Sequence, residues 1–180
     1  MSARSILYTT ALGVLVYGAI GTLPASAQSS AKPTDPQIAH IAYTAGTIDI
    51  ENAQLALKKS KNKDVRAFAE DMVRDHTAVN DKALALVKQL NVTPEDNATS
   101  RSLVKSADAE RAKLAKLNGA AFNRAYVKNE VAYHKAVDNA LQTTLIPDAQ
   151  NPQLKSLLQT GLQIFQGHEK HAEELATELK

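Results

Sequence analysis

The fold can be inferred from one segment, DVRAFAEDMVRDHTAVNDKALALVKQLN (residues 64–91). Its apolar residues recur at alternating steps of four and three, which is typical of a helix that packs in a bundle. The stripe consists of Val65, Ala69, Met72, His76, Val79, Ala83, Leu86 and Leu90. His76 stands where the next apolar residue is expected, so this helix is predicted to carry an imidazole into the core.

Three further segments show apolar stripes at helical spacing. They predict helices over residues 36–60, over residues 120–146, and from residue 152 to the carboxyl end. Residues 101–117 have a weaker helical pattern and many charges, which indicates a short helix on the surface. The sequence shows no sustained two-residue alternation of β-branched residues, so we expect no sheet.

The connections predict how the four long helices are arranged. Short turns join the first helix to the second and the third to the fourth, whereas residues 92–119 are long enough to run the length of a bundle. The helices over 64–91 and 120–146 would then be parallel. The sequence therefore predicts an all-α fold, a ferritin-like four-helix bundle with one long crossover containing a short helix. A plain up-down bundle is the alternative.

The first 27 residues have the features of a signal peptide. Arg4 supplies a positive charge, residues 6–20 are mostly apolar, and residues 25–27 match the A-x-A cleavage pattern. We expect cleavage after Ala27 and export to the periplasm. The alternative is an uncleaved anchor, but the apolar run is shorter than the ~20 residues that a membrane-spanning helix needs. The predicted domains are a signal peptide over 1–27, a flexible arm over 28–35 and the bundle over 36–180.

Composition limits the classes of function. The chain of 180 residues has 21 Lys and Arg, 19 Asp and Glu, a formal charge of +2 and no cysteine. This balance gives no indication of nucleic-acid binding. The carboxyl end contains no second apolar run, so we expect no transmembrane span in the mature chain. An exported protein without cysteine has no disulfides, and its metal ligands would be nitrogen and oxygen atoms.

Polar residues interrupt the stripe of each predicted helix. Three of the five histidines, His76, His134 and His168, occupy stripe positions on three different helices. On the helix over 36–60, the stripe passes through Glu51 or Asn52. With a rise of ~1.5 Å per residue, the heights of these side chains differ by about 4–5 Å within each hairpin. We therefore expect the three histidines and Glu51 to meet near the middle of the bundle.

Four buried polar groups need partners, because each one left unpaired costs about 1–3 kcal/mol. They must satisfy one another, trap water or bind a ligand. Three imidazoles and a carboxylate suit one divalent transition metal ion, such as copper, zinc, iron or manganese. The predicted ligands are Glu51, His76, His134 and His168. The residues predicted to support them are Glu130 and Asp138, one turn either side of His134, and Asp75 next to His76.

Two other interpretations remain open. Glu-x-x-His, the di-iron pattern of ferritin-like bundles, is absent before the three histidines, so oxidase chemistry at such a centre is not expected and no catalytic residue is predicted. The main hypothesis is a periplasmic metal-binding bundle for metal handling or protection of the envelope from stress. The competing hypothesis is a non-catalytic structural or interaction module of the cell envelope, with hydrogen-bonded core histidines and a protein partner.

Four segments also carry a family resemblance. They are TIDIENAQLAL (47–57), VRAFAEDMVRDHTAVN (65–80), GAAFNRAYVKNEVAYHKAV (119–137) and HEKHAEEL (168–175). The chain resembles an exported bacterial domain of unknown function with a ferritin-like bundle, often labelled "predicted outer membrane protein". The resemblance implies a periplasmic helical bundle and supplies no established activity. The sequence itself does not support the outer-membrane label.

Overall fold

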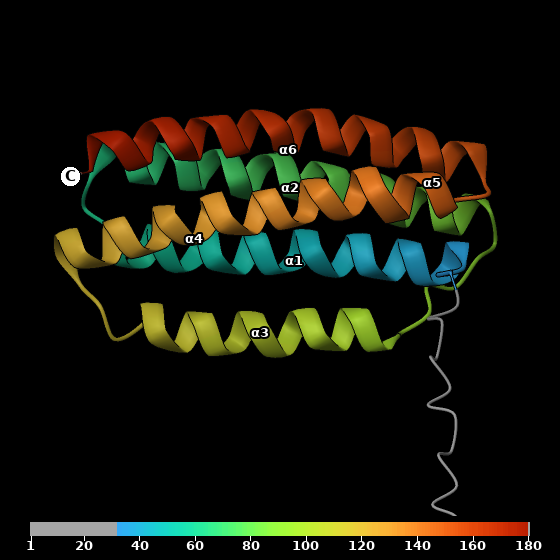
Figure 1. Cartoon of the computed structure of the whole chain (residues 1–180), viewed down its shortest axis with the longest axis horizontal. Helices are drawn as coiled ribbons and strands as arrows, with labels where there is room; N and C mark the ends of the chain where they lie inside the picture. The colour runs from blue at the N-terminus through green and yellow to red at the C-terminus, as the bar shows by residue number, and fades with distance from the viewer. Residues whose placement is uncertain (1–31, 180) are drawn as a thin grey trace, which may run out of the picture. The chain divides into compact units, whose positions relative to one another are not determined.

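The computed structural model describes residues 32–179, and all regular secondary structure in that range is helical. Four long helices, α1 (Asp35–Lys59), α2 (Lys63–Gln89), α4 (Gly119–Ala140) and α6 (Pro152–Glu178), form a bundle (Figure 1). Helix α3 (Ala98–Leu114) lies against the outside of α1, and η1 (Leu141–Leu145) and α5 (Ile146–Asp148) continue α4. The predicted all-α class is confirmed.

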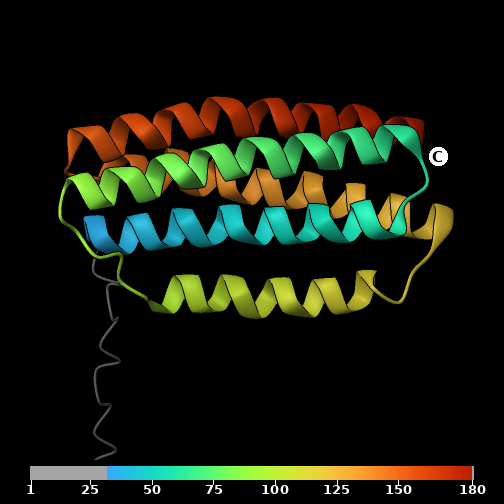
Figure 2. The same ribbon diagram turned by 180° about the vertical axis from the view of Figure 1, so that it is seen from behind.

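Helix α3 determines the topology. It carries the chain back along the bundle, so that α2 and α4 run in the same direction and α1 and α6 run in the opposite one (Figures 1 and 2). The ferritin-like bundle with one long crossover is therefore confirmed, and the up-down alternative is wrong. The predicted signal peptide, its cleavage site and residues 28–31 of the predicted arm lie outside the described residues.

Asparagine caps and one aspartate set the ends of the helices. The side chains of Asn62 and Asn151 each accept two backbone N–H groups from the first turns of α2 and α6. The Asp35 carboxylate accepts the backbone N–H groups of Gln150 and Asn151, both at 2.8 Å. The start of α1 is therefore tied to the turn that precedes α6. Every helix between residues 32 and 179 falls short of the length or the apolar content that a membrane span requires.

The end of α4 differs from the predicted helix over residues 120–146, which Pro147 follows directly. Helix α4 ends at Ala140, and η1 follows with π-helical geometry, in which the Ile146 N–H donates to the Leu141 carbonyl. Proline cannot donate a backbone hydrogen bond, and its ring crowds the carbonyl four residues earlier. The wider π turn relieves this crowding, and the helical path then continues to Asp148.

The core consists of two apolar clusters. One contains Phe68, Met72, Phe122, Val127 and Leu175, among others. The other contains Ile38, Ile41, Leu141, Leu158 and Phe165, among others. On each of the four bundle helices, buried polar residues separate the members of one cluster from those of the other. The clusters supply hydrophobic stabilisation at both ends of the bundle and leave the middle for polar groups.

Helices α1 and α2 approach closely at Gly46. A Cβ atom at this position would overlap the side-chain oxygen of Asn80. Asn80 is buried, and its Nδ2 donates to the Tyr43 carbonyl and to Thr47 Oγ1, both at 3.3 Å. The amide therefore cannot move aside without losing these bonds.

Replacing Gly46 by alanine is expected to lower the free energy of unfolding by about 2 kcal/mol, because overpacking and lost hydrogen bonds outweigh the better helix propensity. Gly167→Ala is the matched control, since a Cβ there meets no atom within 4 Å. The control should gain about 0.5–1 kcal/mol. Urea denaturation measures both variants, and a Gly46→Ala protein as stable as the control would contradict this close approach.

Candidate metal centre

Six ionisable side chains meet in the middle of the bundle, and each is at most 7% exposed. They are Asp49 from α1, His76 from α2, Glu130, His134 and Asp138 from α4, and His168 from α6. The three residues of α4 are spaced four apart, which places them on one face of the helix. All four bundle helices therefore contribute to one polar layer between the two apolar clusters.

The structure brings the three predicted histidines together. The ring centroids of His76 and His134 are 5.7 Å apart, and that of His168 lies 5.3 Å from the first and 5.5 Å from the second. One ring nitrogen from each histidine lies within 4.8 Å of the other two. The positions of the histidines along their predicted helices were therefore sufficient to predict that the three rings lie at one level of the bundle.

Asp49 is the carboxylate beside these rings. Its Oδ2 lies 3.1 Å from Nε2 of His76 and 3.4 Å from Nε2 of His134. Around a tetrahedral ion with bonds of ~2.0–2.1 Å, neighbouring ligand atoms are about 3.3 Å apart. The separations of Asp49 from the two rings match that spacing.

The prediction that Glu51 faces the core is wrong. Glu51 is exposed, and its Oε2 lies 2.9 Å from Nη2 of Arg111 in α3. The buried face of α1 includes Asp49 and Ala56, whose spacing of seven returns to the same side of a helix. Glu51 is two residues beyond Asp49 and therefore more than half a turn away. The alternative position, Asn52, is 3% exposed.

In His134 and in His168, a hydrogen bond determines which of the two ring nitrogens is protonated and which keeps a free lone pair. His134 Nδ1 lies 3.0 Å from the Glu130 carbonyl oxygen, which only accepts, so Nδ1 carries the proton and Nε2 faces Asp49 with its lone pair. His168 Nε2 donates to Asp75 Oδ2 at 3.0 Å, which leaves Nδ1 unprotonated. Both rings are thus oriented as metal-binding histidines usually are.

The supporting residues act on different partners than predicted. Asp75 holds His168 rather than His76, and hydrogen bonds from Arg74 lower its pKa. The main-chain carbonyl of Glu130, not its carboxyl, orients His134. Asp138 makes no hydrogen bond to a ring within the described part of the chain.

Burial keeps two rings neutral. It lowers the pKa of His168 to about 4, although the hydrogen bond to Asp75 opposes the shift. It also lowers the pKa of His134, although the negative charge of Asp49 opposes the shift. Metal binding requires unprotonated imidazole, so both rings are ready to act as ligands at neutral pH.

Asp49 and Glu130 are both 0% exposed, but burial and neighbouring groups shift their pKa values in opposite directions. Burial raises the pKa of Glu130 well above its ordinary range, and repulsion by Asp49 adds to the shift. Burial alone would raise the pKa of Asp49, but the interactions with its neighbours, above all with His76, outweigh burial, so this pKa lies below its ordinary value. Asp49 is therefore the carboxylate, and Glu130 is the carboxylic acid. Together with the rings, these groups could hold a metal ion.

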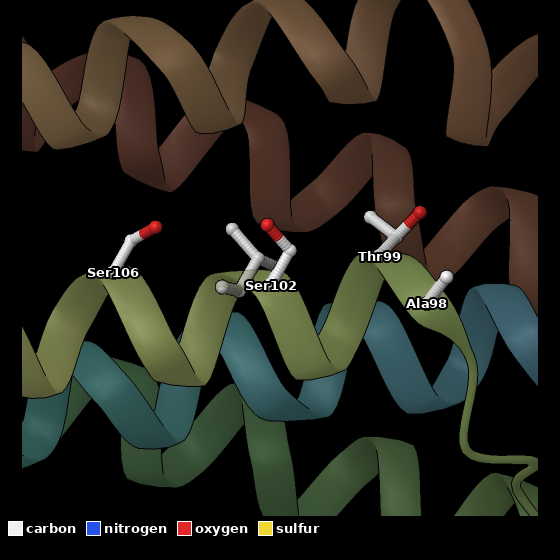
Figure 3. Close-up of a pocket in the computed structure, with 5 residues that line it drawn as sticks. Ala98, Thr99, Ser102 and Ser106 are labelled. Atoms are coloured by element: carbon white, nitrogen blue, oxygen red, sulfur yellow. The ribbon is translucent and has the colours of Figure 1, made fainter.

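A surface pocket on α3 is separate from this centre. Its lining residues are Ala98, Thr99, Ser102, Leu103 and Ser106. The side chains of Thr99, Ser102 and Ser106 point to one side of α3 (Figure 3). These lining residues offer hydroxyl and apolar groups and include no ionisable side chain, so the pocket adds nothing to the metal-binding groups.

Comparisons with known proteins agree with this fold. Residues 21–175 match a family described as "Domain of unknown function (DUF4142)". The chain belongs to the DUF4142 family. This confirms the resemblance to an exported-type family of unknown function. No curated protein matches the chain in sequence.

One solved structure shows the same architecture as this DUF4142 chain. It is a crystal structure of a DUF305 protein from Streptomyces coelicolor that is assigned as secreted. The TM-score is 0.68, the match covers 79% of this chain and 91% of the other, and the sequences are 13% identical. At this identity the similarity supports the fold alone.

The pH dependence of stability that Asp138 causes tests whether this polar layer is buried as described. Burial, together with repulsion from Glu169, raises the pKa of Asp138 to about 7 from an ordinary value of 3.8. The folded protein therefore binds this proton more tightly than the unfolded chain does. The stabilising contribution is complete below pH 3.8 and is lost as the pH rises to 7.

Asp138→Asn is accordingly expected to raise the free energy of unfolding at pH 8 by about 2 kcal/mol, with little gain at pH 4. A shift of about three pKa units would correspond to about 4 kcal/mol without screening, and water near the carboxyl reduces this by about half. Urea denaturation in the presence of chelator at both pH values measures this. Asp81→Asn, on the exposed surface of α2, is the control and should change neither value. A gain that is equal at pH 4 and pH 8 would show that Asp138 does not hold a proton in the core.

Proposed function

We propose that this protein is an exported helical bundle that binds one divalent transition metal ion through His76, His134, His168 and Asp49. The observation that carries the proposal is that one nitrogen from each of the three rings lies within 4.8 Å of the other two, with a carboxylate oxygen of Asp49 beside His76 and His134, in the buried middle of the bundle. Each of the four bundle helices supplies one ligand: α1 supplies the carboxylate, and α2, α4 and α6 supply the rings.

The purely structural alternative leaves too many polar atoms unpaired. His134 Nε2, His168 Nδ1 and Asp49 Oδ1 have no hydrogen-bond partner among residues 32–179. Each such atom costs about 1–3 kcal/mol, so the set would remove much of the ~5–15 kcal/mol that stabilises a domain. The two nitrogens are those that the hydrogen bonds of each ring leave free to bind a metal. A metal ion would pair with both of them and with an oxygen of Asp49.

The ligand set also favours certain metals. It contains three nitrogen atoms, one oxygen atom and no sulfur, and the separations of Asp49 from two of the rings fit four-coordinate binding, which suits zinc or cobalt(II) best. Copper, iron and manganese are compatible with the same atoms. A site this deeply buried would keep the ion away from bulk solvent and from large reactants. This supports a role in metal handling, or in protecting the periplasm from metal-driven oxidation.

Zinc added to the chelator-stripped protein is expected to raise the free energy of unfolding by about 2.7 kcal/mol when its concentration is a hundred times the dissociation constant. Calorimetric titration and thermal unfolding measure binding and stabilisation together. Asp49→Asn and His134→Ala should weaken zinc binding at least a hundredfold, because each removes a ligand.

Glu51→Gln is the matched control for Asp49→Asn, since it changes an acid of the same helix that faces α3 rather than the rings. It should bind zinc like the original protein. Circular dichroism checks that each variant is folded. The proposal would be contradicted by the absence of any metal-dependent stabilisation, or by a Glu51→Gln protein that loses binding while Asp49→Asn retains it.

A further inference from the structure

Two polar groups of α4 beside the centre are not used by the proposed ligand set. They are the carboxyl of Glu130 and the hydroxyl of Tyr126, which lie one turn apart on the same face of the helix. Both side chains are 0% exposed. Glu130 Oε2 and the Tyr126 hydroxyl lack a hydrogen-bond partner within the range 32–179. Unpaired buried groups of this kind need an explanation.

Glu130 faces the metal ligands. One of its carboxyl oxygens, one oxygen of Asp49 and one ring nitrogen of His134 all lie within 4.8 Å of one another. The Glu130 carboxyl therefore lies next to two of the proposed ligands, on the α1 and α4 side of the centre.

Tyr126 lies one helical turn before Glu130, and aromatic contacts hold its ring in place. Its ring stacks on Phe122 with centroids 6.1 Å apart and meets Phe68 edge-on at 6.2 Å. These contacts prevent the hydroxyl from turning toward the surface. Burial raises the pKa of Tyr126, and the charges of Glu130 and Asp49 add to the shift. The hydroxyl therefore stays protonated and can donate a hydrogen bond near the two carboxyls.

The net charge of the site with a metal ion bound indicates what kind of ligand the Tyr126 hydroxyl could bind. A divalent ion held by three neutral imidazoles and the Asp49 carboxylate keeps one uncompensated positive charge. A net charge buried in a protein core is unfavourable, so a monoanion next to the ion is favoured. Because the surrounding side chains are fully buried, such an anion has to be only a few atoms in size.

We infer that the side of the centre between Glu130 and Tyr126 binds a small ligand of the metal ion, a water molecule that monoanions such as azide can replace. This inference rests on the proposed metal site. The Tyr126 hydroxyl donates a hydrogen bond to the ligand, and Glu130 is its second polar neighbour. The two unpaired groups then have a partner that the four metal ligands do not supply.

The test uses the full chain loaded with cobalt(II), whose visible spectrum reports its ligands. Azide is expected to change the cobalt spectrum with a saturable dependence on concentration. Tyr126→Phe should weaken azide binding about tenfold and leave the affinity for cobalt unchanged. It should also fold normally, because it removes a hydroxyl with no hydrogen-bond partner in the described range.

Tyr133→Phe is the matched control. The Tyr133 hydroxyl donates to the Ala45 carbonyl at 2.9 Å, so its loss should not affect azide binding. The inference would be overturned if azide left the cobalt spectrum unchanged, or if wild type and Tyr126→Phe bound azide equally well. Azide binding only after Glu130→Gln would also overturn it, because Glu130 would then be a direct ligand. Failure of wild type to bind cobalt would instead overturn the proposed metal site itself.

Discussion

The contact between the Asp49 carboxylate and the rings of His76 and His134 places a negative charge where no solvent reaches it. Such a charge is tolerated only when nearby groups compensate for the lost hydration. The compensation here depends on the register of three helices. Rotating α1 by one residue would turn Asp49 by ~100° and point it away from both rings. The polar layer therefore constrains how the helices pack, and the packing in turn sets the geometry of the centre.

The rest of the bundle supports this layer from both sides. Phe165, a member of one apolar cluster, stacks on His76 with centroids 4.5 Å apart and an angle of 7° between the ring planes. This contact fixes the orientation of the His76 ring. Toward the surface, His168 is held by Asp75, and Asp75 is held by Arg74. The rings are thus positioned before any ligand arrives. Preorganised ligands bind more tightly, because less conformational entropy is lost on binding.

Most of the fold, and the three rings of the centre, could be predicted from the sequence. On α2, α4 and α6 the apolar stripe marks the buried face, so His76, His134 and His168 were found as interruptions of it. The same reasoning failed on α1, because α2 and α3 both pack on it and bury a wide arc of its surface. Within such an arc the stripe does not define a single central line. A useful signal was present, since Asp49 stands between two isoleucines and seven residues before the buried Ala56.

Other features depend on contacts that the sequence does not display. The hydrogen bond from His168 to Asp75 joins residues far apart in the chain, and the π turn before Pro147 is a local adjustment of an otherwise helical pattern. Both required the three-dimensional structure.

X-ray absorption at the zinc edge of the zinc-loaded protein tests the central claim most directly, because it reports the atoms around the ion. Ligation by His76, His134, His168 and Asp49 predicts three imidazole nitrogens and one oxygen at ~2.0–2.1 Å. A shell of oxygen atoms alone, with no imidazole scattering, would show that zinc binds elsewhere and would contradict the account.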